Sequence, residues 1–455
     1  MTPLYSNITK NRIDIILTAN SPGELLGWVT PIVHALRNKR ENLRIFLFLL
    51  PCPYATGKEY QIASSLKGID FVFKPYEYIL FMFLGVRPQG IRFSKHGAIL
   101  HLGGDVLHSA MLSRRLGYPA FAYVWGNKKW DKEFQEYFVP HEQQKNILIN
   151  RGIPASKIII TGNLLADTIA LMENDEEDIS NLFQWKNSSD NKTSLRVCFL
   201  PGSRQQEIHF IVPFFLAVAE LLNEQNKNIE FIMPLSPFVD IEQLRKAIKR
   251  KPWRNFDGSP GIIERRGSGW VMKNNQGAAI LVINGHQYQA MKHSDLVVTI
   301  PGTKCGEAGY LCRPMVVILP FNKPEELPSV GVIGWLRWLP VLGQMLKRFI
   351  ISIRLRNWNA YVAQPNIIAG EEIVPEIKGV ITASQVANSI LDLLNNPDRL
   401  SLIQKKLFSV YHSNDCQNEG ASELIIQEIF KAIDNGTTRR NDHLLSQEVL
   451  SGRSR

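Results

Sequence analysis

The stretch Phe199-Leu200-Pro201-Gly202-Ser203-Arg204-Gln205-Gln206-Glu207-Ile208 decides the fold of the second half of this chain. Apolar and β-prone residues precede it from Leu195 onward, which predicts a buried parallel strand. The strand ends at Pro201-Gly202, Ser203 is a good N-cap, and an apolar-periodic helix follows. The free N–H groups of such a turn favour an anion, and Arg204 adds a fork of donors. The alternative is an ordinary strand-to-helix turn with a surface arginine.

A second stretch of the same kind favours the anion site. The apolar strand 296–300 ends in Pro301-Gly302-Thr303-Lys304-Cys305-Gly306-Glu307, which opens a short helix. Glu307 can accept both hydroxyls of a ribose, as the acidic residue of a dinucleotide site does. Together the two turns predict a nucleotide-diphosphate pocket. Its expected binding residues are Gly202, Ser203, Arg204, Gly302, Thr303 and Glu307, and Lys304 either assists or is a solvated lysine.

Bulk composition indicates a globular protein with a polyanionic partner. The chain has 455 residues, 45% of them hydrophobic and 21% charged, with a net charge of +10. None of the usual nucleic-acid-binding modules is visible, so we expect no nucleic acid. The amino terminus lacks the apolar region of a signal peptide. The five cysteines are scattered, which indicates reduced thiols in the cytoplasm and argues against a zinc ribbon.

Strand and helix patterns alternate almost throughout, which predicts an α/β fold with two doubly wound sheets. An acidic and then polar segment interrupts the alternation, as a linker does. The expected organisation is a first Rossmann-like domain over 12–172, a linker over 173–194, a second Rossmann-like domain over 195–382, carboxyl-terminal helices over 383–434 and a disordered tail over 435–455.

Several motifs line up, in order over about 12–430, with one family. The chain resembles the lipid-A-disaccharide synthases, and more closely their divergent "synthase-related" members. The matching motifs are Asn20-Ser21-Pro22-Gly23-Glu24, Gly103-Gly104-Asp105, Gly162-Asn163-Leu164-Leu165-Ala166-Asp167, Leu200-Pro201-Gly202-Ser203-Arg204-x-x-Glu207-Ile208, Gly302-Thr303-x-x-x-Glu307 and Pro365-Asn366-Ile367-Ile368-Ala369-Gly370. The arginine and Pro-Asn motifs are specific in combination.

The resemblance implies a GT-B plan, in which two Rossmann-like domains face a cleft. It also implies an inverting, metal-independent glycosyltransferase that moves an acylated glucosamine from a UDP donor to a lipid-linked sugar acceptor. Such an enzyme needs no cofactor, lies peripherally on the inner face of the cytoplasmic membrane and forms a homodimer.

The first half of the chain departs from the family pattern. Asn163-Leu164 replaces the family's His-Pro, and a Ser-Pro-Ser-Val-Trp-Ala-Trp stretch is reduced to residues 123–129. Transfer from a sugar nucleotide is therefore better supported than any particular acceptor. The alternatives are another GT-B glycolipid glycosyltransferase, an enzyme like the UDP-N-acetylglucosamine epimerases, and a non-catalytic binding protein.

Asp105 is the expected general base, because it follows two glycines at the carboxyl end of a strand and the resemblance gives that place to a Gly-x-Asp. Its alternative role is an N-cap. Glu24 is expected at the acceptor, or else as a charge at a helix N-terminus, and Asn366 at the nucleotide, or else as a turn residue. His101 and His108 flank Asp105 without a common face, so we expect no metal site.

Two segments suggest contact with a membrane. The apolar run 78–84 is too short to span a bilayer and includes Phe81 and Phe83. The segment 327–370 contains no Asp or Glu. It combines aromatic and basic residues, as a segment at a membrane interface does, and these include Trp335, Trp338, Arg348 and Arg354. The alternative is a core helix with a basic rim.

Overall fold

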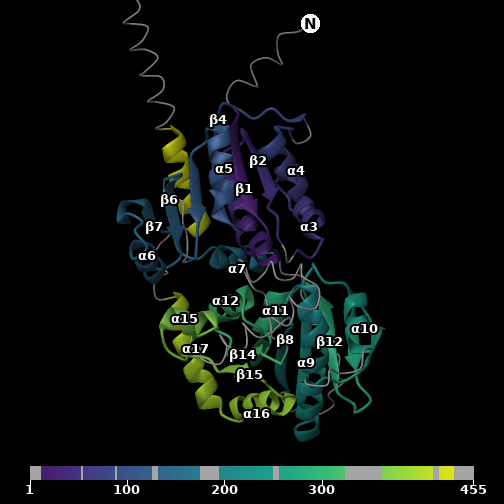
Figure 1. Ribbon diagram of the computed structural model, residues 1–455. Helices are drawn as coiled ribbons and strands as arrows, with labels where there is room; N and C mark the ends of the chain where they lie inside the picture. The colour runs from purple at the N-terminus through teal and green to yellow at the C-terminus, as the bar shows by residue number, and fades with distance from the viewer. Residues whose placement is uncertain are drawn as a thin grey trace, which may run out of the picture. The chain divides into compact units, whose positions relative to one another are not determined.

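The computed structural model describes residues 12–52, 55–87, 90–125, 132–174, 194–249, 256–322, 360–412 and 420–434. They form two compact units (Figure 1). Unit 1 contains the chain up to Leu171 and the part from Gln417 onward, whereas unit 2 runs from Met172 to Cys416. The predicted linker and tail lie mostly outside the described residues.

Unit 1 is a seven-stranded parallel sheet with the order β3-β2-β1-β4-β5-β6-β7. Its strands are β1 (Ile13–Ala19), β2 (Leu43–Leu49), β3 (Phe71–Phe73), β4 (His96–His101), β5 (Ala120–Tyr123), β6 (Phe134–Val139) and β7 (Ile158–Ile160). Its helices are α1 (Pro22–Glu24), η1 (Leu25–Val29), α2 (Thr30–Lys39), α3 (Glu59–Ser65), α4 (Pro75–Ile79), η2 (Leu80–Leu84), α5 (Val106–Leu116), α6 (Glu142–Ile149), η4 (Ala155–Lys157) and α7 (Leu164–Asn174).

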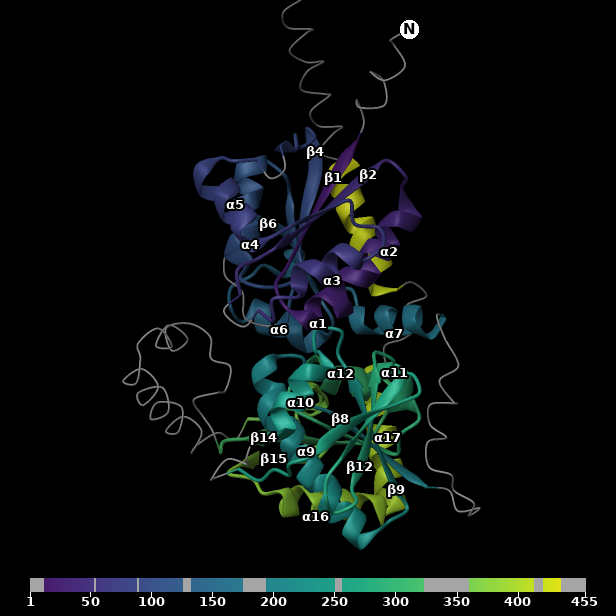
Figure 2. The same ribbon diagram turned by 90° about the vertical axis from the view of Figure 1, so that its right-hand side faces the viewer.

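The sheet of unit 1 is wound in both directions from β1. The chain first adds β2 and β3 on one side and then β4 to β7 on the other, so the switch point lies between β1 and β4. Helices α4 and α5 cover one face, and α2 and the helix over 421–434 cover the other (Figure 2). Ligands bind at the carboxyl ends of strands at such a switch point.

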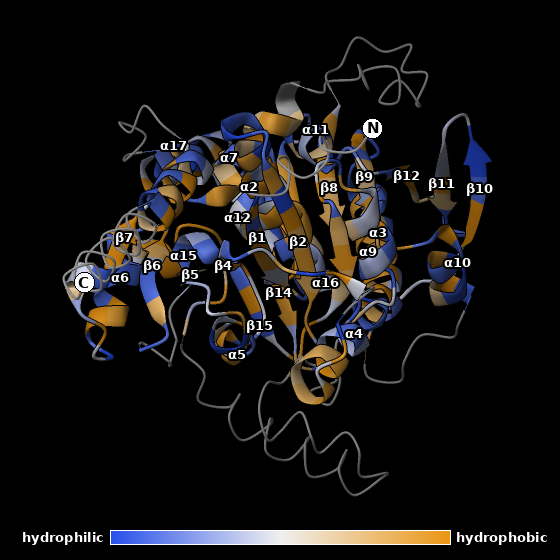
Figure 3. Ribbon diagram, turned by 90° about the horizontal axis from the view of Figure 1, so that it is seen from above, coloured by the Kyte–Doolittle hydropathy of each residue, from blue (hydrophilic) through white to orange (hydrophobic). Residues whose placement is uncertain are grey.

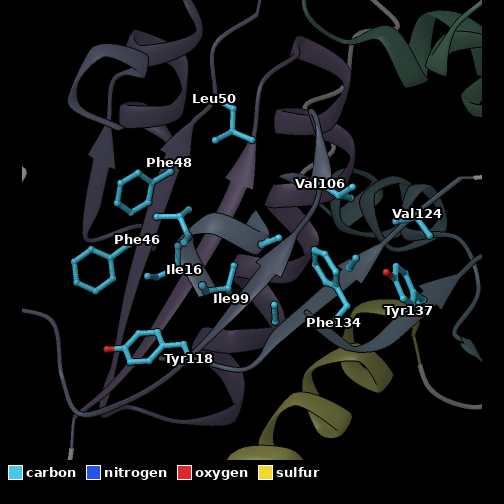
Figure 4. Packing of buried hydrophobic residues seen from close by; sticks show 14 of the residues in the cluster. Ile16, Phe46, Phe48, Leu50, Ile99, Val106, Tyr118, Val124, Phe134 and Tyr137 are labelled. Carbon is cyan, nitrogen blue, oxygen red and sulfur yellow. The ribbon is translucent and has the colours of Figure 1, made fainter. Parts of the chain in front are cut away.

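The core between the sheet and the helices α4 and α5 is strongly aromatic. Phe46, Phe48, Phe73, Tyr78 and Phe81 pack together at this face, all less than 5% exposed. Figure 4 shows Phe46 and Phe48 side by side, with Ile16 and Ile99 beside them. Each aromatic side chain in such a cluster buries about 150–250 Å², so the cluster contributes strongly to the stability of this unit.

Unit 2 is an eight-stranded sheet with the order β10-β11-β12-β9-β8-β13-β14-β15. The strands are β8 (Leu195–Leu200), β9 (Ile229–Leu235), β10 (Ile262–Arg266), β11 (Gly269–Lys273), β12 (Ala279–Asn284), β13 (Leu296–Thr299), β14 (Met315–Pro320) and β15 (Glu376–Gly379). The helices are α9 (Gln205–Gln225), α10 (Ile241–Lys249), α11 (Gln287–Lys292), α12 (Thr303–Tyr310), α15 (Gln364–Ala369), α16 (Ala383–Leu394) and α17 (Pro397–His412).

The second sheet is mixed, a feature that the alternating pattern does not predict. Strands β10 and β11 form an antiparallel hairpin that extends to β12, whereas the other strands pair in parallel. Figure 3 shows the parallel strands β8 and β9 in orange and β10 largely in blue. Four of the five residues of β10 are exposed, so the hairpin edge does not carry the apolar signal of a buried strand.

Helix α9 is long and apolar enough to cross a bilayer, and no other described helix passes that test. Half of its apolar window is buried in unit 2, where α9 packs against α10 and α16. It also contains Pro213. These features are typical of the core helix of a globular domain.

The last described helix, over 421–434, returns to unit 1. Its first N–H groups, from Ala421 and Ser422, donate to the Asp167 carboxylate of α7. Near its end, the Arg40 guanidinium lies 4.3 Å from the centroid of the Phe430 ring and pairs with Asp434. A capped helix end and a cation–π contact thus fix this segment far from its neighbours in the sequence.

Candidate functional site

Both predicted site regions lie at switch points of the two sheets. In unit 2 the chain adds β9 on one side of β8 and β13 on the other, and Leu200 lies opposite Thr299. The turns after β8 and β13 therefore start side by side. We call residues 202–207 and 302–307 the unit 2 switch point. In unit 1, Thr18 of β1 lies opposite His101 of β4, and residues 20–24 and 103–105 form the unit 1 switch point.

The Glu207 carboxylate organises the first turn of unit 2. Its Oε2 accepts the N–H groups of Ser203 at 2.9 Å and Arg204 at 3.0 Å, which closes a capping box at the start of α9. A Cβ at Gly202 would overlap this carboxylate, and the φ of +99° at Gly202 also favours glycine. The glycine of the motif is therefore required by the close approach of Glu207.

The Arg204 guanidinium makes one hydrogen bond to the same carboxylate, through Nη1. Its Nη1 lies 2.9 Å from Oε1 of Glu207, and about a third of the side chain is exposed. Its Nε–H is buried and makes no hydrogen bond with any residue that the structure describes. A guanidinium with an unused donor at a switch point is poised to bind an oxyanion.

The Glu307 carboxylate is buried under a cation in the neighbouring turn. Lys304 Nζ lies 2.9 and 2.8 Å from its two oxygens, and Gln287 Nε2 donates at 3.1 Å. Burial raises the pKa of Glu307, and the Lys304 charge opposes that rise. The ribose role of Glu307 stays a prediction, since ribose hydroxyls need the positions that Lys304 and Gln287 now hold. Thr303 opens α12 after Gly302, whose φ is +155°.

Asn366 is fully buried and fully hydrogen-bonded in α15. Its Nδ2 donates to the carbonyl oxygen of Val374 and to Glu376, and its Oδ1 accepts the N–H groups of Ile373 and Val374. All four hydrogen-bonding positions of the amide are thus in use. Asn366 holds the chain between α15 and β15, and we leave it out of the proposed nucleotide site.

Glu24 repeats in unit 1 the arrangement of Glu207 in unit 2. Its Oε2 accepts the N–H groups of Asn20 at 2.8 Å and Ser21 at 3.1 Å. Burial raises the pKa of Glu24, and the hydrogen bonds from the backbone of Asn20, Ser21 and Gly104 oppose the rise. A Cβ at Gly103 would overlap this carboxylate. The helix begins at Pro22, because proline suits the first helical position and Ser21 and Glu24 form a capping box.

Asp105 caps α5 and remains exposed. Its Oδ1 accepts the Leu107 N–H at 2.9 Å, which is the N-cap role. The general-base role stays a prediction, because a cap uses one carboxylate oxygen only.

The two flanking histidines are separated. His101 is buried with Thr18 and Ser109, whereas His108 Nδ1 lies 2.8 Å from the Tyr78 hydroxyl. Burial lowers the pKa of His108, and Asp105 opposes that shift. No cluster of three potential metal ligands occurs in the described ranges.

The predicted membrane residues divide into a buried and an exposed group. Phe81 is 4% exposed and belongs to the aromatic core, so it does not face lipid. Phe83 is 69% exposed. It belongs to an exposed apolar surface that we call the η2 patch, made up of Tyr76, Ile79, Phe83, Leu84 and Val86. The predicted Trp335, Trp338, Arg348 and Arg354 lie outside the described residues.

Sequence reasoning missed Gln287 at the unit 2 switch point. It follows the turn Asn284-Gly285-His286 at the end of β12, and its amide reaches Glu307. His286 has a φ of +51°, an uncommon conformation for a residue other than glycine. A polar turn at the end of an apolar strand was the available signal.

Comparison with known families supports the resemblance stated from the motifs. A family model described as lipid-A-disaccharide synthetase matches residues 157–256, which include the Arg204 turn. A lipid-A-disaccharide synthase of Methylobacillus flagellatus is 24% identical across 86% of this chain and 92% of that protein. Another, of Paraburkholderia phytofirmans, is 28% identical across 52% of this chain and 49% of that protein.

Solved structures support the fold. The chain is similar to a UDP-GlcNAc 2-epimerase from Neisseria meningitidis bound to UDP-GlcNAc, with a TM-score of 0.54 and 14% identity, across 92% of this chain and all of that one. It is also similar to an S. aureus MnaA–UDP co-structure, with a TM-score of 0.55 and 13% identity, across 93% and 97% of the two chains. The predicted GT-B plan of two Rossmann-like domains is thereby confirmed.

Proposed function

We propose that this chain, a divergent member of the lipid-A-disaccharide synthase family, is an inverting glycosyltransferase that moves an acylated glucosamine from a UDP donor to a lipid-linked sugar acceptor. Family membership supports a glycosyltransferase of this type. The identity of the donor and of the acceptor, a peripheral place on the inner face of the membrane and a homodimer are parts of the proposal.

The observation that carries the proposal is Arg204 at the unit 2 switch point. A buried Nε–H without a partner and a partly exposed guanidinium suit a diphosphate group. Lys304, on the neighbouring turn, supplies a second cation. When a diphosphate draws Lys304 away from Glu307, that carboxylate becomes free to accept ribose hydroxyls.

In the proposed reaction Asp105 takes the proton from the acceptor hydroxyl. The hydroxyl oxygen forms a bond to the anomeric carbon of the donor sugar as the bond from that carbon to the diphosphate oxygen breaks. Negative charge therefore develops on UDP, where Arg204 and Lys304 stabilise it. Ser203 and Gly202 shape the turn that receives the phosphates. Glu24 holds the unit 1 turn through the N–H groups of Asn20 and Ser21.

The η2 patch supports a membrane-associated acceptor. Its five side chains are between 44% and 71% exposed and lie on one short helical segment and the turn after it. Exposed Arg87 and Arg92 follow along the chain. A surface that combines exposed apolar groups with basic residues suits the headgroup layer of an anionic bilayer.

Product analysis tests the proposed function. The protein is incubated with a UDP-linked diacylglucosamine and a panel of lipid acceptors, and separately with UDP-N-acetylglucosamine alone. We expect a disaccharide with inverted anomeric configuration and release of UDP. Conversion of UDP-N-acetylglucosamine to its 2-epimer without an acceptor would favour the epimerase alternative instead.

Phe83 and Phe81 form a matched pair for the membrane part of the proposal. Phe83→Ser should weaken sedimentation with anionic vesicles while leaving the melting temperature near that of the wild type, because the ring is exposed. Phe81→Ser should destabilise the fold by about 3–5 kcal/mol, the cost of removing a buried phenylalanine. Wild-type vesicle binding by Phe83→Ser would remove the η2 patch from the proposal.

A further inference from the structure

Unit 1 contains a group of buried nitrogen atoms for which the described residues offer no hydrogen-bond partner. The indole nitrogens of Trp28 and Trp125 and the amide nitrogen of Asn163 are each covered from solvent and make no hydrogen bond within the described part of the chain. The Nε2 atom of His141 is also buried without a hydrogen-bond partner among the described residues. Buried donors are normally paired, so several unpaired ones in one region require an explanation.

These side chains belong to one connected cluster. The ring of Trp28 packs edge-on against Tyr123 with centroids 5.4 Å apart, and Trp125 packs edge-on against His141 at 5.6 Å. The Tyr123 hydroxyl lies 3.5 Å from Oδ1 of Asn163. The Trp125 indole is also near enough to Tyr123 to favour ionisation of its hydroxyl, although without the geometry of a hydrogen bond. We call these five residues the aromatic subsite.

The subsite lies at the carboxyl edge of the sheet. Tyr123 ends β5 and Trp125 follows it, His141 follows β6, and Asn163 follows β7. Trp28 lies in η1, directly after the unit 1 switch point. Four loops from the edge where α/β folds bind ligands therefore supply the unpaired nitrogen atoms, three of which are donors by their chemistry.

Exchanging the amide oxygen and nitrogen of Asn163 by a flip of the side chain would not give the nitrogen a partner. Its Oδ1 accepts the Leu165 N–H at 3.0 Å at the start of α7, which fixes which end of the amide faces the cluster. Its Nδ2 is therefore held toward a place where the described residues offer no acceptor. The indole nitrogens can only donate. The subsite thus presents N–H donors to oxygen acceptors that the described residues do not supply.

The charges around the subsite favour a neutral partner. Burial lowers the pKa of His141 to about 4, so its ring is uncharged near pH 7. Burial raises the pKa of the Tyr123 hydroxyl, and the Asp167 charge adds to the rise. No ion pair or cation–π contact involves the five side chains in the described ranges, and the nearby Asp167 carboxylate disfavours an anion. Aromatic rings with a few donors are typical of a pocket for a small neutral ligand.

We propose that Trp28, Tyr123, Trp125, His141 and Asn163 form a carbohydrate-binding subsite, in which the indole and amide N–H groups donate to hydroxyl or carbonyl oxygens of a neutral hexose ring. The inference deepens the proposed function, because the ring would be the acceptor sugar. It places recognition of that sugar on the two segments in which the sequence departs from the family pattern, around Trp125 and Asn163.

The test is a titration of the full chain, labelled with ¹⁵N at the tryptophan indoles, with N-acetylglucosamine at millimolar concentrations. Trp28→Phe and Trp125→Phe identify the two resonances, and Trp270 in unit 2 is the control. We expect the Trp28 and Trp125 indole N–H signals to move in a saturable way as they gain acceptors, while the Trp270 signal stays in place. Asn163→Asp retains the oxygen that caps α7 and removes the donor, so it should weaken the sugar about tenfold.

Three results would overturn the inference. Indole N–H signals that do not shift on addition of N-acetylglucosamine would mean that the subsite does not bind the sugar and holds only water. A response to inorganic phosphate but not to the sugar would show that the site takes an anion. Unchanged sugar affinity in Asn163→Asp, with a melting temperature like that of the wild type, would remove Asn163. Glycosyl transfer without any sugar response would reject the subsite alone, whereas a sugar response without transfer would reject only the proposed function.

Discussion

The two switch points have the same backbone design but differ in charge, because the carboxylates of unit 2 are paired with cations and that of unit 1 is not, among the residues described. In each unit a glutamate near the start of the first helix, Glu24 or Glu207, accepts two N–H groups of its own turn. In unit 2 that glutamate pairs with Arg204, and Lys304 pairs with Glu307. In unit 1 the described hydrogen-bond partners of Glu24 are backbone N–H groups and the Ser21 side chain, and none of them is a cation.

The difference indicates a division of labour. In each unit the glutamate carboxylate occupies the position that a bound anion would take, and it keeps the turn ordered when no ligand is bound. In unit 2, Arg204 and Lys304 can exchange their glutamate partners for a diphosphate. The acidic turn of unit 1 repels a second anion, but it suits a hydroxyl that must lose a proton. Nucleotide binding is thus expected in unit 2 and proton removal in unit 1.

The largest expected effect is on turnover. Asp105→Asn should lower the turnover number by roughly 10²-fold or more, because the general base is lost, while UDP affinity stays unchanged. Asparagine is as good an N-cap as aspartate, so α5 should remain intact. Activity within a few-fold of the wild type would reduce Asp105 to its capping role.

Arg204→Ala should come next, with UDP affinity lowered by about 1.5–3 kcal/mol in a calorimetric titration, the worth of a charge-assisted hydrogen bond. Arg196→Ala is the matched control, because Arg196 pairs with Glu230 on neighbouring strands of the same sheet. Equal UDP affinities in the two variants would show that Arg204 does not bind UDP, and the proposed difference between the two units would then be wrong.

A smaller effect is expected in the pH dependence of stability. Burial raises the pKa of Glu24 above its ordinary 4.5. Its contribution to stability is therefore greatest below about pH 4.5 and is lost as pH rises through the higher folded value. Glu24→Gln should flatten the fall in the free energy of unfolding from pH 4.5 toward neutrality. The exposed Glu142→Gln serves as the surface control, and a slope equal to that of the wild type in Glu24→Gln would contradict the assignment.

The smallest expected effect is that of chelation. We expect EDTA to leave turnover unchanged, because the cations at the unit 2 switch point are side chains. Loss of activity that zinc or magnesium restores would contradict this and would direct attention to His101 and His108.

Sequence reasoning located the two switch points because both are local patterns. An apolar strand, a glycine and a capping residue are consecutive in the chain, and Gly202 and Glu207 are only five residues apart. It named a turn role for Asn366 only as an alternative and did not predict the bonds that Asn366 donates to Val374 and Glu376, since these depend on the path of the following residues. Nor did it separate Phe81 from Phe83, because a π-helical turn decides which ring enters the core. The return of residues 421–434 to unit 1 depends on Asp167, more than 250 residues earlier.

Amide hydrogen exchange with and without saturating UDP tests the contrast between the two units most directly. The account predicts slower exchange in residues 201–208 and 302–307, where the diphosphate and ribose would bind, and unchanged exchange in residues 20–24 and 103–108. Protection of the unit 1 turn, or none in the unit 2 turn, would contradict it.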